Sequence, residues 1–285
     1  MKKAILLPNI KKDPSLTVSA EVAGRLSQLG IEPCLHIDFE KHQIPNVSYY
    51  SDPHPDVDII LVIGGDGSVI EGSRLAVALD VPLLGINLGK VGYLAGLDAD
   101  RLDELSRLAL GDFIVSDNML LTIEKYSTDG SITLCDRLAV NDVVVCHDAP
   151  VGISDIKVEN GRGDSVQYRA DGVILATPAG STAYSLSAGG PIISHGLDSI
   201  TLTPVCPHSF FNRSIVYGAT ECLKITNMAQ GTLIISVDGR PFDRLSEGEF
   251  CTVYKSERRA RMISLDDGNL FTVLSTKIKL LHDLV

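Results

Sequence analysis

One carboxylate stands within a glycine-rich turn in the first quarter of the chain. Residues 64–68 read Gly-Gly-Asp-Gly-Ser, between the apolar run 59–63 and the amphipathic segment 69–79. Glycine lets the backbone approach a ligand closely, and a helix that starts there would offer unpaired N–H groups to a phosphate. Asp66 beside such a phosphate could take a proton from a hydroxyl, so the turn indicates phosphoryl transfer. The spacing fits neither the G-x-G-x-x-G nor the G-x-x-x-x-G-K-[ST] motif, and a purely structural turn is the alternative.

A polar pair interrupts an apolar run near the middle of the chain. Asn141 and Asp142 stand between the apolar residues 138–140 and 143–145. Asn and Asp commonly end strands, and this structural role is one interpretation of the pair. The other is ligand binding, because a carboxylate can accept hydrogen bonds from two ribose hydroxyls while an amide both donates and accepts.

The longest unusual segment is 177–191, which we call the hydroxyl-rich loop. It follows Asp171-Gly172 and the apolar run 173–176. Its small residues allow close backbone approach, and its hydroxyls supply hydrogen-bond donors. The hydroxyl-bearing residues include Ser181, Thr182, Tyr184, Ser185 and Ser187. A flexible linker is the alternative, but linkers do not usually follow a buried strand or carry Tyr and Pro in a compact motif.

The first hundred residues alternate between patterns typical of strands and of helices. Strands are predicted at 4–7, 31–37, 57–63 and 81–86. Helices are predicted at 15–29, 69–79 and about 100–110, with Gly30 at the end of the first. Near-continuous apolar strands that alternate with helices predict a parallel sheet covered by helices on both faces. Open α/β sheets bind ligands at the carboxyl ends of their strands, where residues 64–68 are expected.

After Gly111 the pattern changes to short β-rich runs. They occur at 120–125, 132–138, 140–145, 153–158, 173–176, 200–205, 223–226, 233–237 and 250–254. Turn signals such as Asn160-Gly161 and Asp238-Gly239 lie between them. This pattern predicts an all-β second domain of packed antiparallel sheets. The chain is therefore predicted to be α/β plus all-β, with domains at 1–115 and 116–267.

Composition excludes several classes of protein. A formal net charge of −11 over 285 residues argues against a nucleic-acid partner, which would need a basic surface. The six cysteines are scattered singly, as in a reduced cytosolic protein, and show no zinc-like cluster. No stretch approaches the roughly 18 apolar residues of a membrane span. We therefore expect a cytoplasmic protein without a membrane partner.

Taken together, these motifs resemble those of the bacterial NAD kinases. The resemblance rests on residues 64–68, on Asn141-Asp142, on 171–191 and on the closing 274–277, in the family's order. The Gly-Gly-Asp-Gly element is shared with 6-phosphofructokinases and with lipid kinases. The hydroxyl-rich loop is what separates NAD kinases from those relatives.

The resemblance implies ATP-dependent phosphorylation of the 2′-hydroxyl of the adenosine ribose of NAD, giving NADP, with Mg²⁺. Asp66 would accept the proton of that hydroxyl, and Gly67 would line the same pocket. Asn141 and Asp142 would bind NAD. The pocket would be completed by Arg169, Asp171, Thr182, Ala183, Tyr184, Ser185, Leu186 and Ser187. The family fold pairs a Rossmann-like parallel α/β domain with an antiparallel β-sandwich, and it implies that a segment at about 268–285 returns to the first domain. The family also implies a homodimer or homotetramer.

Two positions depart from the family pattern. Asp142 stands where many members have Glu, so its carboxylate reaches one methylene less far. Arg240 stands where Gln is often found, so it is not among the predicted site residues. A lipid kinase and a non-enzymatic NAD or NADP sensor are the competing hypotheses. The sequence leaves open whether NADH, polyphosphate or feedback by NADPH is involved.

Overall fold

The computed structural model describes residues 1–265 except 53, 90–91, 93, 149–151, 195 and 209–210, and it describes no side chains for 134–136. The chain forms two compact units. Unit 1 comprises Met1–Asp117 and the described residues from Ala260 onward, and unit 2 comprises Asn118–Arg259. The predicted return of 268–285, and the motif at 274–277, lie outside the described residues.

Unit 1 is built on a parallel sheet with the strand order β3-β2-β1-β4-β5. Its strands are β1 (Lys3–Pro8), β2 (Glu32–His36), β3 (Ser48–Tyr50), β4 (Ile59–Gly64), β5 (Leu83–Asn87) and β6 (Leu97–Asp98). The pairs are parallel throughout this order, and the end of β18 adds a parallel pair beside β5. All six residues of β4 are buried, which agrees with the continuous apolar run expected of a central parallel strand.

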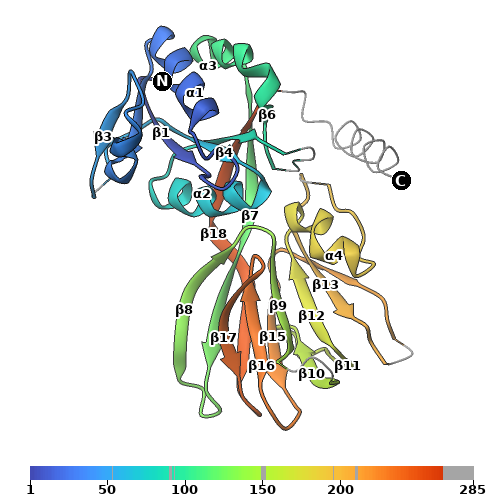
Figure 1. Ribbon diagram of the computed structural model, residues 1–285. Coiled ribbons are helices and arrows are strands. Elements are labelled where there is room, and N and C mark those ends of the chain that lie inside the picture. Colours follow the sequence, from blue (N-terminus) through green and yellow to red (C-terminus); the bar gives the residue numbers. More distant parts are fainter. Residues whose placement is uncertain are drawn as a thin grey trace, which may run out of the picture. The chain divides into compact units, whose positions relative to one another are not determined.

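Helices cover both faces of this sheet (Figure 1). The helical elements are α1 (Thr17–Gln28), η1 (Ile37–His42), α2 (Asp66–Ala78), η2 (Ala99–Leu105) and α3 (Ser106–Leu110). Leu26 of α1 and Leu108 of α3 share one core cluster with one face of the strands. Gly72 of α2 instead lies against Val62 and Leu83, whose side chains point to the opposite face. The predicted helix over 100–110 divides into a 3₁₀ segment and a short α-helix.

The described residues of unit 2 form two sheets. The first has the order β14-β13-β12-β9-β16-β17, with antiparallel pairs throughout. Its strands are β9 (Asp142–His147), β12 (Gly172–Ala176), β13 (Ser199–Val205), β14 (Ile215–Gly218), β16 (Leu233–Val237) and β17 (Arg240–Leu245). The second has the order β11-β10-β15-β18, and β7 pairs with both β18 and β8. Its strands are β7 (Ile114–Tyr126), β8 (Ile132–Ala139), β10 (Ser154–Glu159), β11 (Ser165–Ala170), β15 (Cys222–Asn227) and β18 (Phe250–Ser264).

One core lies between the two sheets of unit 2. Val143 and Leu175 come from the first sheet, and Val158 and Tyr168 come from the second, yet all belong to one cluster of buried side chains. The predicted fold class, a Rossmann-like parallel α/β unit with an antiparallel β-sandwich, is confirmed. The short strands β3 and β6 of unit 1 were not predicted, and in unit 2 the strands that were not predicted are β11, β14 and β17. Each of these three strands of unit 2 lies at the end of its strand order and carries many exposed residues, so its sequence lacks a strong apolar signal.

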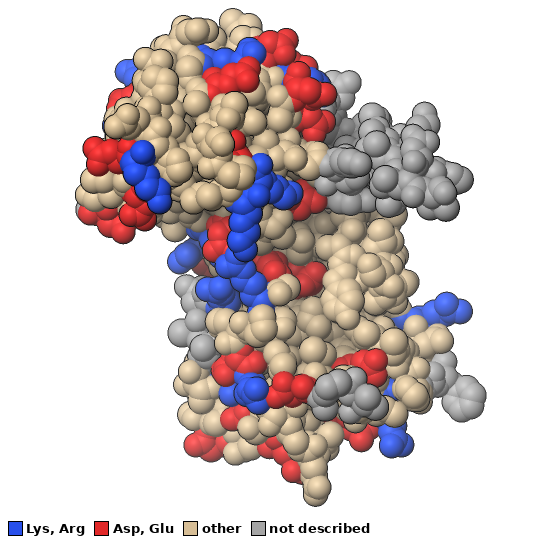
Figure 2. Space-filling view, in the orientation of Figure 1, with Lys and Arg blue, Asp and Glu red and all other residues tan. Residues whose placement is uncertain are grey.

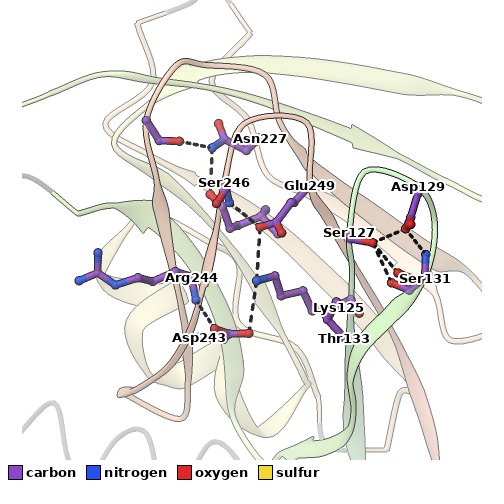
Figure 3. Close-up of polar contacts among 12 residues, drawn as sticks. Lys125, Ser127, Asp129, Ser131, Thr133, Asn227, Asp243, Arg244, Ser246 and Glu249 are labelled. Carbon is purple, nitrogen blue, oxygen red and sulfur yellow. Dashed lines mark hydrogen bonds and ion pairs between the residues drawn. The ribbon is translucent and has the colours of Figure 1, made fainter.

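Polar contacts connect strands of the two sheets at one end of unit 2 (Figure 3). Lys125 of β7 lies 3.5 Å from Asp243 of β17 and 3.3 Å from Glu249, just before β18. Glu249 also accepts the backbone N–H of Ser246 at 2.7 Å. In the nearby β7–β8 hairpin, Asp129 accepts hydrogen bonds from its own turn.

Charged side chains of both signs are interspersed on the face of each unit that Figure 2 shows. In the described part of the chain, no helix is both long enough and apolar enough to span a membrane.

Candidate functional site

The glycine-rich turn (64–68) lies at the carboxyl end of β4, the central strand of unit 1. Helix α2 begins at Asp66, three residues earlier than predicted, so Asp66 occupies its first turn and Gly65 its N-cap. The Oδ1 atom of Asp66 accepts the backbone N–H of Leu94 at 3.0 Å. The carboxylate is half-buried and Gly67 is exposed. This arrangement holds a carboxylate at the edge of the sheet where open α/β folds bind ligands.

Two residues that the sequence analysis did not single out lie around this turn. The side-chain amide of Asn9 donates to the hydroxyl of Ser68 at 2.7 Å. The ammonium of Lys12 lies directly over Gly65, so close that a Cβ on Gly65 would collide with it. Both residues follow β1, whose carboxyl end lies at the same edge as that of β4. Their position just after a predicted parallel strand was the sequence signal that could have identified them as site residues. Lys12 adds a positive charge that can bind a phosphate.

The Asn141-Asp142 turn connects β8 to β9 in unit 2 and is held from two sides. On one side, the carboxylate of Asp238 accepts three successive backbone N–H groups. They belong to Val140 at 3.1 Å, Asn141 at 2.8 Å and Asp142 at 3.3 Å. The N–H of Asp238 in turn donates to the carbonyl of Asp142 at 3.0 Å.

On the other side, the start of the hydroxyl-rich loop (177–191) contacts the same turn. The N–H of Thr177 donates to the carbonyl of Asn141 at 2.8 Å, and its hydroxyl donates to the carbonyl of Val140 at 2.7 Å. Gly180 packs so closely that a Cβ would collide with the Asn141 carbonyl. Only glycine permits this approach, which explains its position in the loop.

The two side chains of the turn differ in how their polar atoms are satisfied. Asp142 is 4% exposed, and burial, together with the nearby charge of Asp238, raises its pKa to about 7. The Oδ1 atom of Asn141 is buried and has no hydrogen-bond partner among the described residues. Buried acceptors are normally paired, so this atom is available to a ligand donor.

The hydroxyl-rich loop is ordered by its own hydroxyls. It forms two short helical turns, η3 (Ala179–Thr182) and α4 (Tyr184–Ser187). The buried Ser181 donates to the carbonyl of Pro178 at 2.6 Å, and the buried Ser185 contacts the hydroxyl of Thr203 at 3.0 Å. Thr182 donates to the carbonyl of Ala179 at 3.1 Å. Such internal bonding is atypical of a flexible linker.

Other members of the loop present their side chains to solvent. Tyr184 is 48% exposed and Leu186 is 36% exposed. Ser187 is exposed as well, and Ala183 is half-buried. The loop therefore has three buried hydroxyls that stabilise it, those of Thr177, Ser181 and Ser185, while the hydroxyls of Tyr184 and Ser187 are exposed and can meet a ligand.

Arg169 and Asp171 lie apart from the Asn141-Asp142 turn within this chain. Asp142 faces Ala176 at one end of β12, whereas Asp171 precedes Gly172 at the other end. Strands rise about 3.3 Å per residue, so the two ends of β12 are about 13 Å apart. Asp171 lies 3.9 Å from the imidazole of His147, and Arg169 is exposed on β11 of the other sheet. The structure thus joins Asn141, Asp142 and the loop start, but it does not bring Arg169 and Asp171 to them.

The described residues hold no group of three or more His, Cys, Asp or Glu side chains that could bind a metal ion.

Two family models match the chain. The ATP-NAD kinase N-terminal domain matches residues 9–111, and the ATP-NAD kinase C-terminal domain matches residues 140–265. The matches include the glycine-rich turn in unit 1 and the Asn141-Asp142 turn in unit 2.

Relatives and solved structures agree with these matches. The chain is 33% identical to the NAD kinase of Caldanaerobacter subterraneus subsp. tengcongensis, covering 98% of this chain and 99% of the relative. It is 34% identical to the NAD kinase of Symbiobacterium thermophilum at the same coverage. An Archaeoglobus fulgidus NAD kinase in complex with ATP superimposes with a TM-score of 0.72 and 26% identity, covering 96% of this chain and 99% of that one. Yeast NADH kinase complexed with NADH gives a TM-score of 0.84 over 96% of this chain and 86% of that one. Its identity of 22% supports the fold alone.

Proposed function

The chain belongs to the ATP-NAD kinase family and is an enzyme of that family. We propose that it phosphorylates the 2′-hydroxyl of the adenosine ribose of NAD. ATP is the proposed phosphoryl donor, and NADP is the product. The single observation that carries the proposed chemistry is the half-buried carboxylate of Asp66 in the first turn of α2.

Asp66 is proposed to accept the proton of the attacking hydroxyl. A ribose hydroxyl is a poor nucleophile at neutral pH, and a positioned base typically accelerates such a step about 10²–10⁴-fold. One oxygen of Asp66 is oriented by the N–H of Leu94, which limits the rotation of the carboxylate. Phosphoryl transfer otherwise depends on in-line placement and charge neutralisation, so a single base suffices.

Asn141 and Asp142 are proposed to bind the hydroxyls of NAD. The unpartnered Oδ1 atom of Asn141 supplies an acceptor, and an ionised Asp142 can accept two hydrogen bonds. Gly67, Arg169, Asp171 and the residues Thr182, Ala183, Tyr184, Ser185, Leu186 and Ser187 remain predicted contributors to the nucleotide site. For Ser185 the contribution would come from its backbone, because its hydroxyl is buried against Thr203.

The phosphates of ATP are proposed to meet Lys12 and the backbone at the start of α2. Lys12 supplies one full positive charge over Gly65, and the helix adds the partial charge of its N-terminus. Mg²⁺ is proposed to arrive with ATP as part of the substrate. Mg²⁺ typically keeps several waters and binds substrate phosphates with one or two carboxylates, so ATP can bring the ion to the site.

A coupled assay tests the proposal. The purified protein is incubated with Mg·ATP and NAD, and NADP is detected with an NADP-specific dehydrogenase. We expect one molecule of NADP to form for each molecule of ADP released. Hydrolysis of the product by a phosphatase that removes only a 2′-phosphate then shows that the new phosphate is on the 2′-oxygen. ATP consumption without NADP, or NAD binding without turnover, would contradict the proposal, and parallel reactions with NADH and polyphosphate define the substrate range.

The proposed location and assembly of the enzyme follow from the family. We propose a cytoplasmic homodimer or homotetramer. Light scattering of the purified protein measures the mass, and a monomer at enzyme concentrations would contradict the assembly. Fractionation of cells that express the tagged full chain tests the location.

A further inference from the structure

Asp238 makes an unusual set of contacts for a residue in a hairpin turn. Its carboxylate accepts the N–H groups of Val140, Asn141 and Asp142 at distances from 2.8 to 3.3 Å. Three consecutive backbone N–H groups that converge on one point form a concave anion site, of the kind that elsewhere binds phosphates. Here the anion is a side chain of the protein itself.

The local backbone brings the carboxylate to this point. Asp238 and Gly239 form the two-residue turn between β16 and β17, with φ values of 51° and 72°. Positive φ at both central residues is typical of the tight hairpin turn that matches strand twist, and Asp-Gly is among its preferred sequences. β16 pairs with β9, which begins at Asp142, so this turn lies beside the Asn141-Asp142 turn.

A carboxylate is needed there because the turn leaves its N–H groups without strand partners. β8 ends at Ala139 and β9 begins at Asp142, so Val140 and Asn141 lie outside the strand ladders. Buried backbone donors must find acceptors, and an ionised carboxyl group supplies them without a competing donor. The Oδ1 atom of Asp238 accepts all three N–H groups, and its Oδ2 atom also lies 3.1 Å from the N–H of Val140. Hydrogen bonds to a charged acceptor are roughly twice as strong as neutral ones.

We propose that Asp238 is a positioning residue that sets the affinity for NAD by holding the Asn141-Asp142 turn, without touching the nucleotide itself. This inference rests on the proposed NAD-binding role of Asn141 and Asp142. Asp238 has a second influence: burial raises the pKa of the Asp142 carboxyl group, and the nearby charge of Asp238 raises it further.

The substitution Asp238→Asn tests the inference because it keeps the size of the side chain but removes the negative charge that the three N–H groups share. It also places an amide donor beside the N–H of Val140, which both oxygens now contact. We expect the KM for NAD to rise about tenfold or more, while the KM for ATP stays within about twofold. A merely structural role would lower the amount of active enzyme without separating the two KM values. Unchanged KM for NAD would overturn the inference.

Asp129→Asn is the matched control. Asp129 also lies in a hairpin turn of unit 2 and also binds local N–H and hydroxyl groups, as Figure 3 shows, but its partners are Ser127 and Ser131. Both KM values should stay at the wild-type level. A rise in the KM for NAD equal to that of Asp238→Asn would show a general hairpin effect and would contradict the inference.

A second variant and a second measurement guard against loss of folding. Gly239→Ala keeps the carboxylate but strains the positive-φ turn that places it, so the KM for NAD should again rise selectively. Hydrogen–deuterium exchange of the peptide covering 138–143 should be slow in the wild type and faster in both variants. Rapid exchange in the wild type would contradict the inference whatever the variants do.

The exchange readout separates this inference from the proposed function. If the wild type forms no NADP, the proposed function fails, and slow exchange of 138–143 with faster exchange in Asp238→Asn still supports the positioning contact. If the wild type forms NADP and Asp238→Asn binds NAD normally, the positioning role fails alone.

Discussion

The carboxylate of Asp238 lies 2.8 Å from the backbone nitrogen of Asn141, although 97 positions separate them in the chain. Thr177 binds the carbonyl of Asn141 from another segment at the same distance. The backbone of one short turn is therefore held by two distant segments. Rigid support of this kind is what a binding site needs, because small errors in position cost affinity.

Replacing Asp66 with Asn should abolish most of the turnover without disturbing the fold. The amide keeps an oxygen that can accept the N–H of Leu94, but it cannot take a proton from a hydroxyl. We expect kcat to fall about 10²–10⁴-fold, with both KM values within a few-fold of wild type. Asp58→Asn is the control, since Asp58 immediately precedes the same strand and binds the N–H groups of Lys2 and Lys3. Near-normal kcat in Asp66→Asn would remove Asp66 as the proton acceptor.

Replacing Lys12 with Met should weaken the use of ATP. The ammonium of Lys12 lies over Gly65, and its loss removes a cation from the start of α2. Hydrogen bonds to charged groups contribute about 1.5–3 kcal/mol, so kcat/KM for ATP should fall about ten- to a hundredfold. Lys11→Met changes the charge equally at the neighbouring exposed position and should leave kcat/KM unchanged. Equal losses in the two variants would indicate a general charge effect instead of a contact with phosphate.

Sequence patterns predicted the long elements of the first unit because their signals are local, whereas the short η1, β3 and β6 were missed. β4 is a continuous buried run, and the glycine-rich turn after it leads directly into α2. The boundary of α2 was placed three residues late, since Asp66 and Gly67 are poor helix formers that nevertheless start the helix. Asp66 itself could be singled out because the elements on both sides of it are adjacent in sequence.

The parts that escaped prediction depend on contacts between distant segments. Asp238-Gly239 is recognisable as a turn, but nothing in its own sequence indicates that its carboxylate binds residues 140–142. The sequence also did not indicate that Ser185 is buried while its neighbours are exposed. Its hydroxyl contacts Thr203, which lies on the distant strand β13. Whether the remaining predicted residues contact the nucleotide stays a prediction.

The ion cluster around Lys125 should contribute to the stability of unit 2. Lys125 is 11% exposed and lies between the carboxylates of Asp243 and Glu249, so Lys125→Met would leave two acidic groups facing each other. We expect the free energy of unfolding to fall by about 1–3 kcal/mol, less than for a fully buried pair because Asp243 is partly solvated. Lys157→Met breaks the more exposed pair with Glu159 and should cost at most about 0.5 kcal/mol. Urea unfolding measures both, and equal losses would contradict a specific role for the cluster.

The raised pKa of Asp142 predicts how stability depends on pH. Its pKa is about 7 in the folded protein, against an ordinary value of 3.8, because burial and then the charge of Asp238 disfavour ionisation. Between these two values the folded state binds more protons at this position than the unfolded state does. The contribution of Asp142 is therefore greatest below about pH 4 and is lost as the pH rises to about 7, a change on the order of 3–4 kcal/mol.

The Asp142→Asn variant isolates this contribution, since an amide does not titrate. The stability of the wild type minus that of Asp142→Asn should fall between pH 4.5 and 7 and level off above about pH 7.5, as measured by urea unfolding at each pH. Asp129→Asn is the control: hydrogen bonds from Ser127 and Ser131 lower the pKa of Asp129 to about 2, so its difference from the wild type should stay flat above pH 5. A flat difference for Asp142→Asn as well would mean that Asp142 is ionised throughout this range. In that case the carboxylate would be ready to bind ribose hydroxyls at every pH tested, and NAD binding would show no acid limit near pH 7.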